Sequence, residues 1–173
     1  PFVIRYPRGR GLICDWKQPF KPIVVGTGQC IKEGTDVAVL SIGPIGNIAH
    51  EAIKLWEENS GKSAALFDMR FLKPLDTELL HKVAKEYNRI ITIENGTVLG
   101  GLGSAVMEFM AENNFKPSII RLGLPDQFIE HGSTPQLLHL CNIDKEAVID
   151  ALNRIVEQYQ QQQCKRFLLN RNY

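Results

Sequence analysis

The chain has 173 residues, 44% of them hydrophobic and 23% charged. These values are typical of one globular domain with a buried core, and they exclude a fibrous or low-complexity chain. Twenty basic residues balance 19 acidic ones to a net charge of +1, so no excess charge indicates a nucleic acid or an anionic membrane as the partner.

The four cysteines and the lengths of the apolar runs indicate the cellular compartment. The cysteines, which include no Cys-x-x-Cys pair, are typical of reduced thiols rather than of a zinc site or a disulfide framework. No apolar run approaches the ~20 residues of a membrane helix. The N-terminal segment lacks the apolar core of a signal peptide and an initiator methionine. We therefore expect a cytoplasmic protein.

In chain order, residues 2–6 predict a strand that stands apart from the rest, and a linker-like connector follows it to residue 22. Residues 23–31 predict an edge strand. From there on, short apolar runs predict buried strands and three- to four-residue apolar spacing predicts helices. The predicted strands are 36–42, 64–71, 89–94 and 118–122. The predicted helices are 45–58, one opening at 74–76, 104–112, 135–140 and, after an N-cap-like Asp144, 146–156.

The alternation of strands and helices with short loops predicts an α/β fold. It favours a three-layer α/β/α arrangement with a mostly parallel sheet, covered by helices on both faces. The polar residues 158–163 and the mixed residues 164–173 predict a frayed helix or a tail.

A glycine-rich loop, 96–103, lies between a predicted strand and a predicted helix, as a dinucleotide-binding loop would. Val106 stands where the third small residue of that fingerprint belongs, and no acidic residue ends a strand about twenty residues later. Two interpretations are open. The loop binds a nucleotide, or its small residues let a helix pack close to the sheet, which the pattern favours.

Two arginines are candidates for binding an anion, since a guanidinium holds phosphate or carboxylate through paired, charge-assisted hydrogen bonds. Arg8 lies just beyond a predicted strand, where open α/β sheets place ligand contacts. Arg70 also lies at a strand end, but Asp68 and Asp76 are near it as ion-pair partners, which favours a structural role.

The histidines form no relay in the sequence. His131, beside Glu130 in a loop, is the one that could titrate within a site, whereas His50, His81 and His139 fall in helical stretches. No serine nucleophile elbow, His-Glu-x-x-His motif or Walker loop occurs. We therefore expect neither a catalytic residue nor a metal ligand in this chain.

Four motifs occur in order: RYPRG at 5–9, DMRFLKPLD at 68–76, GGLGS at 100–104 and LGLPDQFI at 122–129. Over about residues 1–157 the chain closely resembles the C-terminal part of the 1-deoxy-D-xylulose-5-phosphate synthases, thiamin diphosphate enzymes of the transketolase superfamily. Transketolases and 2-oxoacid dehydrogenase beta subunits share the sheet plan but typically not these motifs together. Residues 159–173 fall outside the resemblance.

The resemblance implies how the chain is divided. Residues 1–10 would end a pyrimidine-binding domain, 11–35 would form a connector and an edge strand, 36–157 would be the C-terminal domain, and 158–173 a tail. It also implies that the edge strand is antiparallel to a sheet of five strands. Because the sequence begins inside a predicted strand, we expect it to be part of a longer protein.

The family joins pyruvate, with loss of CO2, to glyceraldehyde 3-phosphate, using thiamin diphosphate and Mg2+. The family's Gly-Asp-Gly diphosphate motif and its pyrimidine-domain glutamate are absent from this chain. We therefore expect the chain alone to bind no cofactor, to be inactive, and to have a structural and interfacial role. The resemblance assigns the acceptor phosphate to Arg8, and it implies a homodimer and two further domains as partners. A free-standing flavodoxin-like binding or regulatory module remains the alternative.

Overall fold

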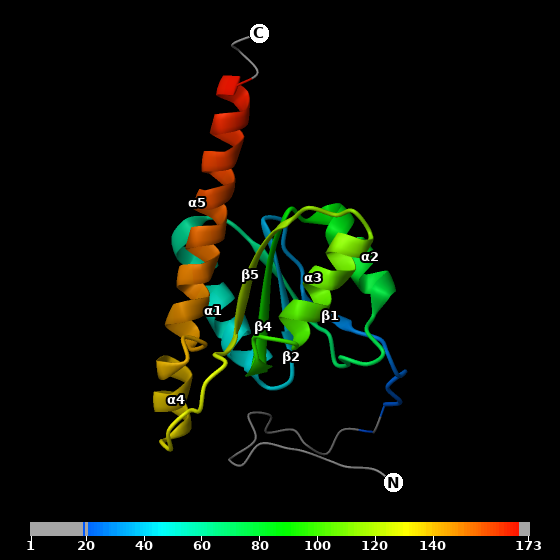
Figure 1. Cartoon of the computed structure of the whole chain (residues 1–173), viewed down its shortest axis with the longest axis vertical. Helices are drawn as coiled ribbons and strands as arrows, with labels where there is room; N and C mark the ends of the chain where they lie inside the picture. The colour runs from blue at the N-terminus through cyan, green and yellow to red at the C-terminus, as the bar shows by residue number, and fades with distance from the viewer. Residues whose placement is uncertain (1–18, 20, 170–173) are drawn as a thin grey trace.

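The computed structural model describes residues 19 and 21–169, with side chains as far as Tyr159 (Figure 1). One sheet of five strands in the order β1-β3-β2-β4-β5 forms its centre. The strands β3, β2, β4 and β5 are parallel, and β1 pairs antiparallel with β3 at one edge. This confirms the predicted sheet. The strands are β1 (Gln29–Lys32), β2 (Val37–Ile42), β3 (Ala64–Asp68), β4 (Arg89–Thr97) and β5 (Ser118–Leu124).

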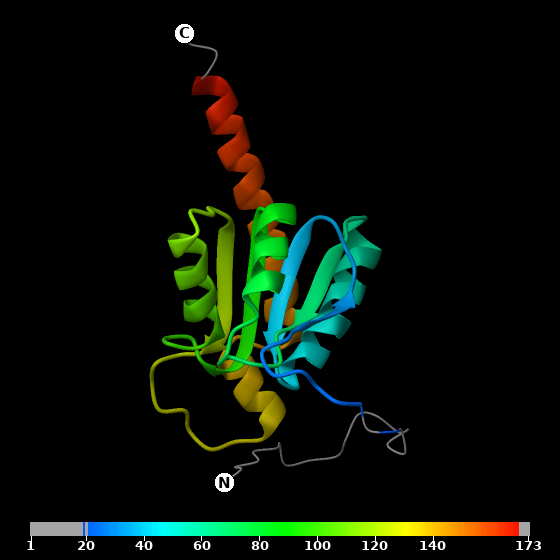
Figure 2. The same cartoon turned by 90° about the vertical axis from the view of Figure 1, so that its right-hand side faces the viewer.

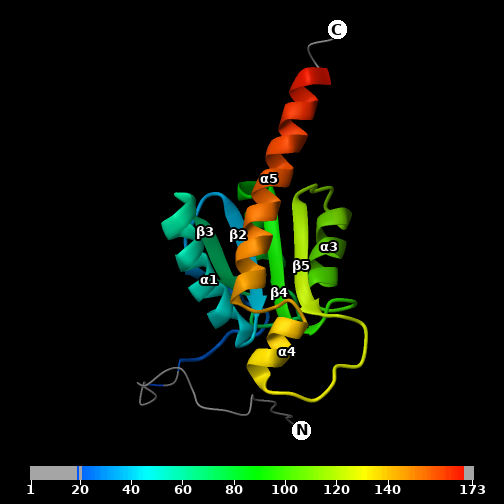
Figure 3. The same cartoon turned by 90° about the vertical axis from the view of Figure 1, so that its left-hand side faces the viewer.

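Helices cover both faces of the sheet, which confirms the three-layer arrangement (Figures 2 and 3). The helices α1 and α5 pack on one face, and α2 and α3 pack on the other. The helices are α1 (Ile45–Ser60), α2 (Thr77–Glu86), α3 (Leu102–Glu112), α4 (Thr134–Leu140) and α5 (Lys145–Leu169). In the part of the chain that the structure describes, no helix has the length and apolarity needed to cross a membrane.

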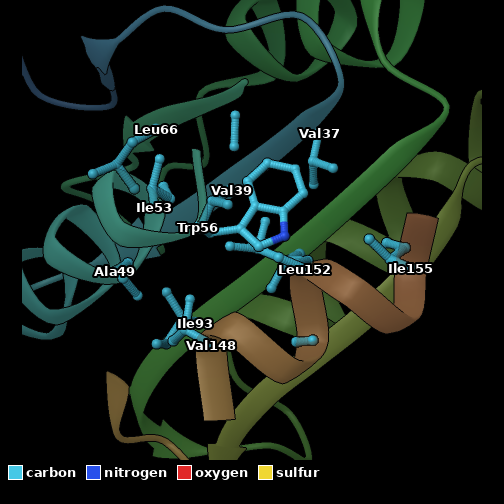
Figure 4. Close-up of a cluster of buried hydrophobic side chains, with 14 of the residues drawn as sticks. Val37, Val39, Ala49, Ile53, Trp56, Leu66, Ile93, Val148, Leu152 and Ile155 are labelled. Atoms are coloured by element: carbon cyan, nitrogen blue, oxygen red, sulfur yellow. The ribbon is translucent and has the colours of Figure 1, made fainter. Parts of the chain in front are cut away.

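The core under α1 and α5 is centred on Trp56, which packs between the sheet and α5 (Figure 4). Its indole N–H donates to Asn153 Oδ1 at 2.8 Å, so the polar end of this buried ring is satisfied by α5. The first four residues of β2 are fully buried because both faces of this central strand are covered. Cys30 and Cys141, the two cysteines with described side chains, are free thiols.

The predicted edge strand over 23–31 is too long. Residues 23–28 form no strand, because Thr27 turns back on Val24: its N–H and its hydroxyl both donate to Val24 O, at 3.3 and 2.8 Å. Gly26 in the same turn has a φ of 80°, which only glycine adopts without strain. The strand β1 therefore begins at Gln29.

The other differences are at element ends. The strand β3 stops at Asp68 rather than at residue 71, because Arg70 adopts a left-handed conformation with a φ of 54°. The strands β4 and β5 pair again at Thr97 and Leu124 after an irregularity, beyond their predicted ends. The helix α3 begins two residues earlier than predicted, and the backbone of α5 stays helical through Leu169.

Candidate functional site at the carboxyl edge of the sheet

The carboxyl ends of β3, β2, β4 and β5 meet at one edge of the sheet, together with the loops that follow them. We call this the carboxyl edge. The incoming chain, residues 21–28, reaches the domain here, since the Gly28 N–H donates to Asp76 Oδ2 at 2.7 Å beside the start of α2. Open α/β sheets bind ligands at such an edge.

Glu94 is a buried carboxylate near the end of β4, with 5% of its surface exposed. Its Oε2 accepts the Leu102 N–H and its Oε1 accepts the Gly103 N–H, each at 2.9 Å. Both donors belong to the first turn of α3, which has no side-chain cap at Gly101. Because a helix N-terminus carries partial positive charge, Glu94 acts as an internal anion that stabilises the start of α3.

Gly101 and Gly103 are required by this close approach. A Cβ at Gly101 would collide with the Glu94 carboxylate, and a Cβ at Gly103 would lie 2.8 Å from Thr92 Oγ1. The amides that would hold a pyrophosphate in a dinucleotide fold are already bonded to Glu94. The structure thus supports the interpretation that these glycines allow close packing, and it does not support nucleotide binding.

Arg121 on β5 fixes the loop between β4 and α3. Its Nη1 donates to Val98 O at 2.9 Å and to Ser104 Oγ at 3.4 Å. The Ser104 hydroxyl also accepts the Gly100 N–H at 2.9 Å. Arg121 thus holds the loop at Val98, and Ser104 holds it at Gly100. The loop therefore has a fixed conformation, and it presents Leu99 at the surface.

Arg70 lies at the carboxyl edge as predicted, but among the described residues it forms no ion pair with Asp68 or Asp76. The Asp68 carboxylate accepts the backbone N–H of Arg70 at 3.0 Å, and Asp76 caps α2 by accepting the Leu79 N–H at 2.9 Å. The Arg70 guanidinium donates instead to Gln29 Oε1 on β1. Among the described residues, Arg70 thus joins the edge strand to the end of β3, which is a structural role.

The four histidines lie in different parts of the fold. His50 and His131 are exposed, and His131 has no hydrogen-bond partner among the described residues. His81 is half-buried and packs edge-on against Phe109, with 4.9 Å between the ring centroids.

His139 and Asp144 are hydrogen-bonded where α4 meets α5, with 2.6 Å between Nδ1 and Oδ2. Asp144 also accepts the Ala147 N–H at 2.9 Å, which confirms it as the N-cap of α5. Burial acts to raise the pKa of Asp144. The hydrogen bonds from Ala147 and His139 outweigh burial and hold this pKa below its ordinary value. The ionised carboxylate is thus the form that the fold stabilises.

Replacing Asp144 with alanine is expected to lower the free energy of unfolding by about 1 kcal/mol at pH 7, the usual value of an N-cap. Because folding lowers the pKa of Asp144, its contribution is present above the ordinary pKa of 3.8 and is lost as the pH falls through the folded value. Urea unfolding at pH 7 and pH 3 should therefore show a smaller difference between wild type and variant at pH 3. The control is Asp150→Ala, which removes an exposed pair with Arg154. An equal difference at both pH values would contradict the assignment.

Tyr87 lies at the edge of the sheet opposite to the carboxyl edge, between α2 and β4. Burial, followed by the nearby acidic side chain of Glu86, raises the pKa of this phenol. The hydroxyl donates to Gly34 O at 2.6 Å, where it joins the end of α2 to the turn before β2. Tyr87 therefore serves the fold rather than a site.

Arg8, the predicted phosphate ligand, lies outside the described residues. The sequence analysis did not identify Glu94 or Arg121, although the hydrogen bonds of both side chains fix the conformation of the glycine-rich loop. An acidic residue directly before a glycine-rich loop and a helix start is the signal that points to the Glu94 contact. Arg121 carries no such signal, because its partner Val98 is reached only through the pairing of β4 with β5.

The sequence of this domain matches a known family. Residues 26–148 match the family described as "Transketolase, C-terminal domain". The match covers most of the chain, so the chain belongs to the transketolase C-terminal domain family.

Individual relatives agree with the motif-based resemblance. The chain is 53% identical over 154 residues to 1-deoxy-D-xylulose-5-phosphate synthase of Bacteroides fragilis, an alignment that covers 89% of this chain and 24% of the relative. The synthase of Bacillus mycoides is 38% identical over 157 residues, with 90% and 25% covered. The chain thus spans about a quarter of the length of these relatives, and the predicted resemblance to this synthase family is confirmed.

Solved structures agree on the fold. The chain of "Split gene transketolase, inactive beta4 tetramer" matches with a TM-score of 0.70 and 37% identity, over 80% of this chain and 44% of that one. Transketolase from Campylobacter jejuni matches with a TM-score of 0.56 and 13% identity, over 79% of this chain and 20% of that one, which shows the fold alone. These matches do not favour the alternative of a free-standing flavodoxin-like module.

Proposed function

We propose that this chain is the C-terminal part of a 1-deoxy-D-xylulose-5-phosphate synthase, a transferase that joins pyruvate, with loss of CO2, to glyceraldehyde 3-phosphate. The observation that carries the proposal is the 53% identity over 154 residues to such a synthase. The joint occurrence of the motifs RYPRG, DMRFLKPLD and LGLPDQFI in this chain also supports the proposal. The domain's own role in the enzyme is structural and interfacial.

The cofactors that the family implies are thiamin diphosphate and Mg2+, and the described residues do not fit them. Among these residues, no group of three or more His, Cys, Asp or Glu side chains is arranged to hold a metal ion. The amides at the start of α3, which could face a diphosphate, are bonded to Glu94. In the proposal both cofactors therefore belong to the other domains of the enzyme, and the isolated chain is inactive.

Arg8 is the substrate-binding residue of the proposal. Its guanidinium keeps its charge at any working pH, so it suits a phosphate dianion and is a poor acid or base. Arg8 is the second arginine of RYPRG, and the family resemblance assigns this arginine to the acceptor phosphate. The proposal further includes a homodimer in the cytoplasm, as the resemblance implies.

The test uses two proteins. The full-length gene product, purified with thiamin diphosphate and Mg2+, should form 1-deoxy-D-xylulose 5-phosphate from pyruvate and glyceraldehyde 3-phosphate, with release of CO2. The 173-residue chain should give no binding heat when it is titrated with thiamin diphosphate and Mg2+ in a calorimeter. A full-length protein without synthase activity would refute the function. Submicromolar cofactor binding by the 173-residue chain would refute the assignment of the cofactors to other domains.

A further inference from the structure

Large apolar side chains are exposed along the carboxyl edge. Ile23, Val24 and Val25 precede β1, and Leu99 and Phe128 lie in the loops that follow β4 and β5. We call these five the edge residues. Contiguous or repeated apolar exposure on one side of a domain is typical of an interaction surface, since each such group is more stable when a partner removes it from water.

Phe128 is the most exposed of the edge residues, with 105% of its reference surface in contact with solvent. It stands in the loop after β5, which forms a shallow hollow with Thr97. The Gln127 N–H donates to Pro125 O at 2.8 Å, and the neighbouring Ile129 packs against the core, so the chain on both sides of Phe128 is fixed. An aromatic ring presented in this way costs little conformational entropy on binding, as expected of an anchor residue.

The path of the chain identifies the occupant of this surface. Residues 21–28 reach the domain at the carboxyl edge, where the Gly28 N–H is bonded to Asp76. Any domain joined through this segment is therefore tethered next to the edge residues. The synthase relatives are about four times as long as this chain, because the alignment covers 24% of their length. The linker from a preceding domain would therefore end beside the edge residues.

We propose that the carboxyl edge, with Phe128 as its anchor, is the docking surface for the domain that precedes this one in the same polypeptide. The proposal rests on the proposed function, because it requires a longer protein of the synthase kind. When the linker between two domains is short, it holds them at an effective concentration of roughly millimolar. A second copy of the chain at ordinary protein concentrations competes poorly with such a neighbour.

Hydroxyl-radical labelling of the full-length protein tests this surface on the wild-type side chains. The oxidation rate of each residue is measured by mass spectrometry in the native and in the guanidinium-unfolded protein. Phe109, which is 7% exposed, is the matched protected phenylalanine, and Met107 and Leu55 are exposed controls on α3 and α1. Native Phe128 should be oxidised about fivefold more slowly than in the unfolded protein, as Phe109 is, while Met107 and Leu55 change about twofold or less.

A variant pair checks the coupling between edge residues. Phe128→Asp should raise the oxidation of Leu99 in the full-length protein, because the docked domain loses its anchor. Leu55→Asp, which introduces the same charge at a 38% exposed apolar residue on α1, should leave Leu99 protected.

Each result bears on one proposal. Native Phe128 oxidised as fast as in the unfolded protein overturns the docking surface, whatever the enzymatic activity. Protection that disappears on dilution assigns the surface to a second copy and also overturns it. Concentration-independent protection in a protein without synthase activity supports the docking surface and refutes the proposed function.

Discussion

Replacing Arg8 with alanine in the proposed full-length synthase is expected to lower kcat/KM for glyceraldehyde 3-phosphate by about thirty- to a thousandfold. This corresponds to the loss of a charge-assisted phosphate contact, on the order of 2–4 kcal/mol. Arg8→Lys keeps the charge but loses the paired hydrogen bonds, so its effect should be intermediate. Steady-state kinetics with each aldehyde acceptor measures the change.

The comparison that decides the role of Arg8 is between phosphorylated and unphosphorylated glyceraldehyde. Arg8→Ala should reduce the preference of the enzyme for the phosphorylated aldehyde, and pyruvate addition should change much less. Arg10→Ala, which removes an arginine just outside the RYPRG motif, serves as the control. If Arg8→Ala slows both aldehydes equally, the residue acts through folding or domain closure and the phosphate role is wrong.

Replacing Glu94 with alanine is expected to lower the free energy of unfolding of the 173-residue chain by about 3 kcal/mol. The reason is that two buried N–H donors of α3, at Leu102 and Gly103, lose an ionised acceptor that water cannot easily replace. The loss is measured by urea unfolding at pH 7 with linear extrapolation.

Two further variants separate charge from packing at this position. Glu94→Gln retains one oxygen acceptor and nearly the same volume, so it should destabilise by roughly half as much as Glu94→Ala. Glu108→Ala removes an exposed glutamate from the same helix and should change stability by about 0.5 kcal/mol or less. An effect of Glu94→Ala no larger than that of Glu108→Ala would show that the carboxylate does not hold the helix start.

The fold was predictable because its signals are local. The apolar run of β2 and the three- to four-residue spacing in α1 are visible in short windows of sequence, and the structure confirms both elements. The ends of the elements depend on distant partners. The strand β3 stops early because Arg70 turns left-handed, and β5 continues to Leu124 because it pairs again with Thr97. Such pairings are not visible in a single window.

The candidate site was less predictable for the same reason. The glycines at 101 and 103 were identified, and close packing was the favoured interpretation, but the group that packs against them was not. Glu94 reads as the last residue of an apolar strand, and its contact with α3 exists only once the loop of 96–101 folds back. Phe128 was part of a recognised motif, but the motif does not show that Phe128 is exposed while its neighbour Ile129 packs against the core.

The course of α5 has a practical consequence for handling the protein. This helix of 25 residues is about 37 Å long, and it runs from the carboxyl edge across the sheet and past the opposite edge (Figures 1 and 3). A fluorescent protein, an affinity tag or a linker to a solid support fused beyond Leu169 is thereby carried away from Phe128 and the incoming chain. Attachment at this end allows the protein to be immobilised in one orientation, with the carboxyl edge facing the solution.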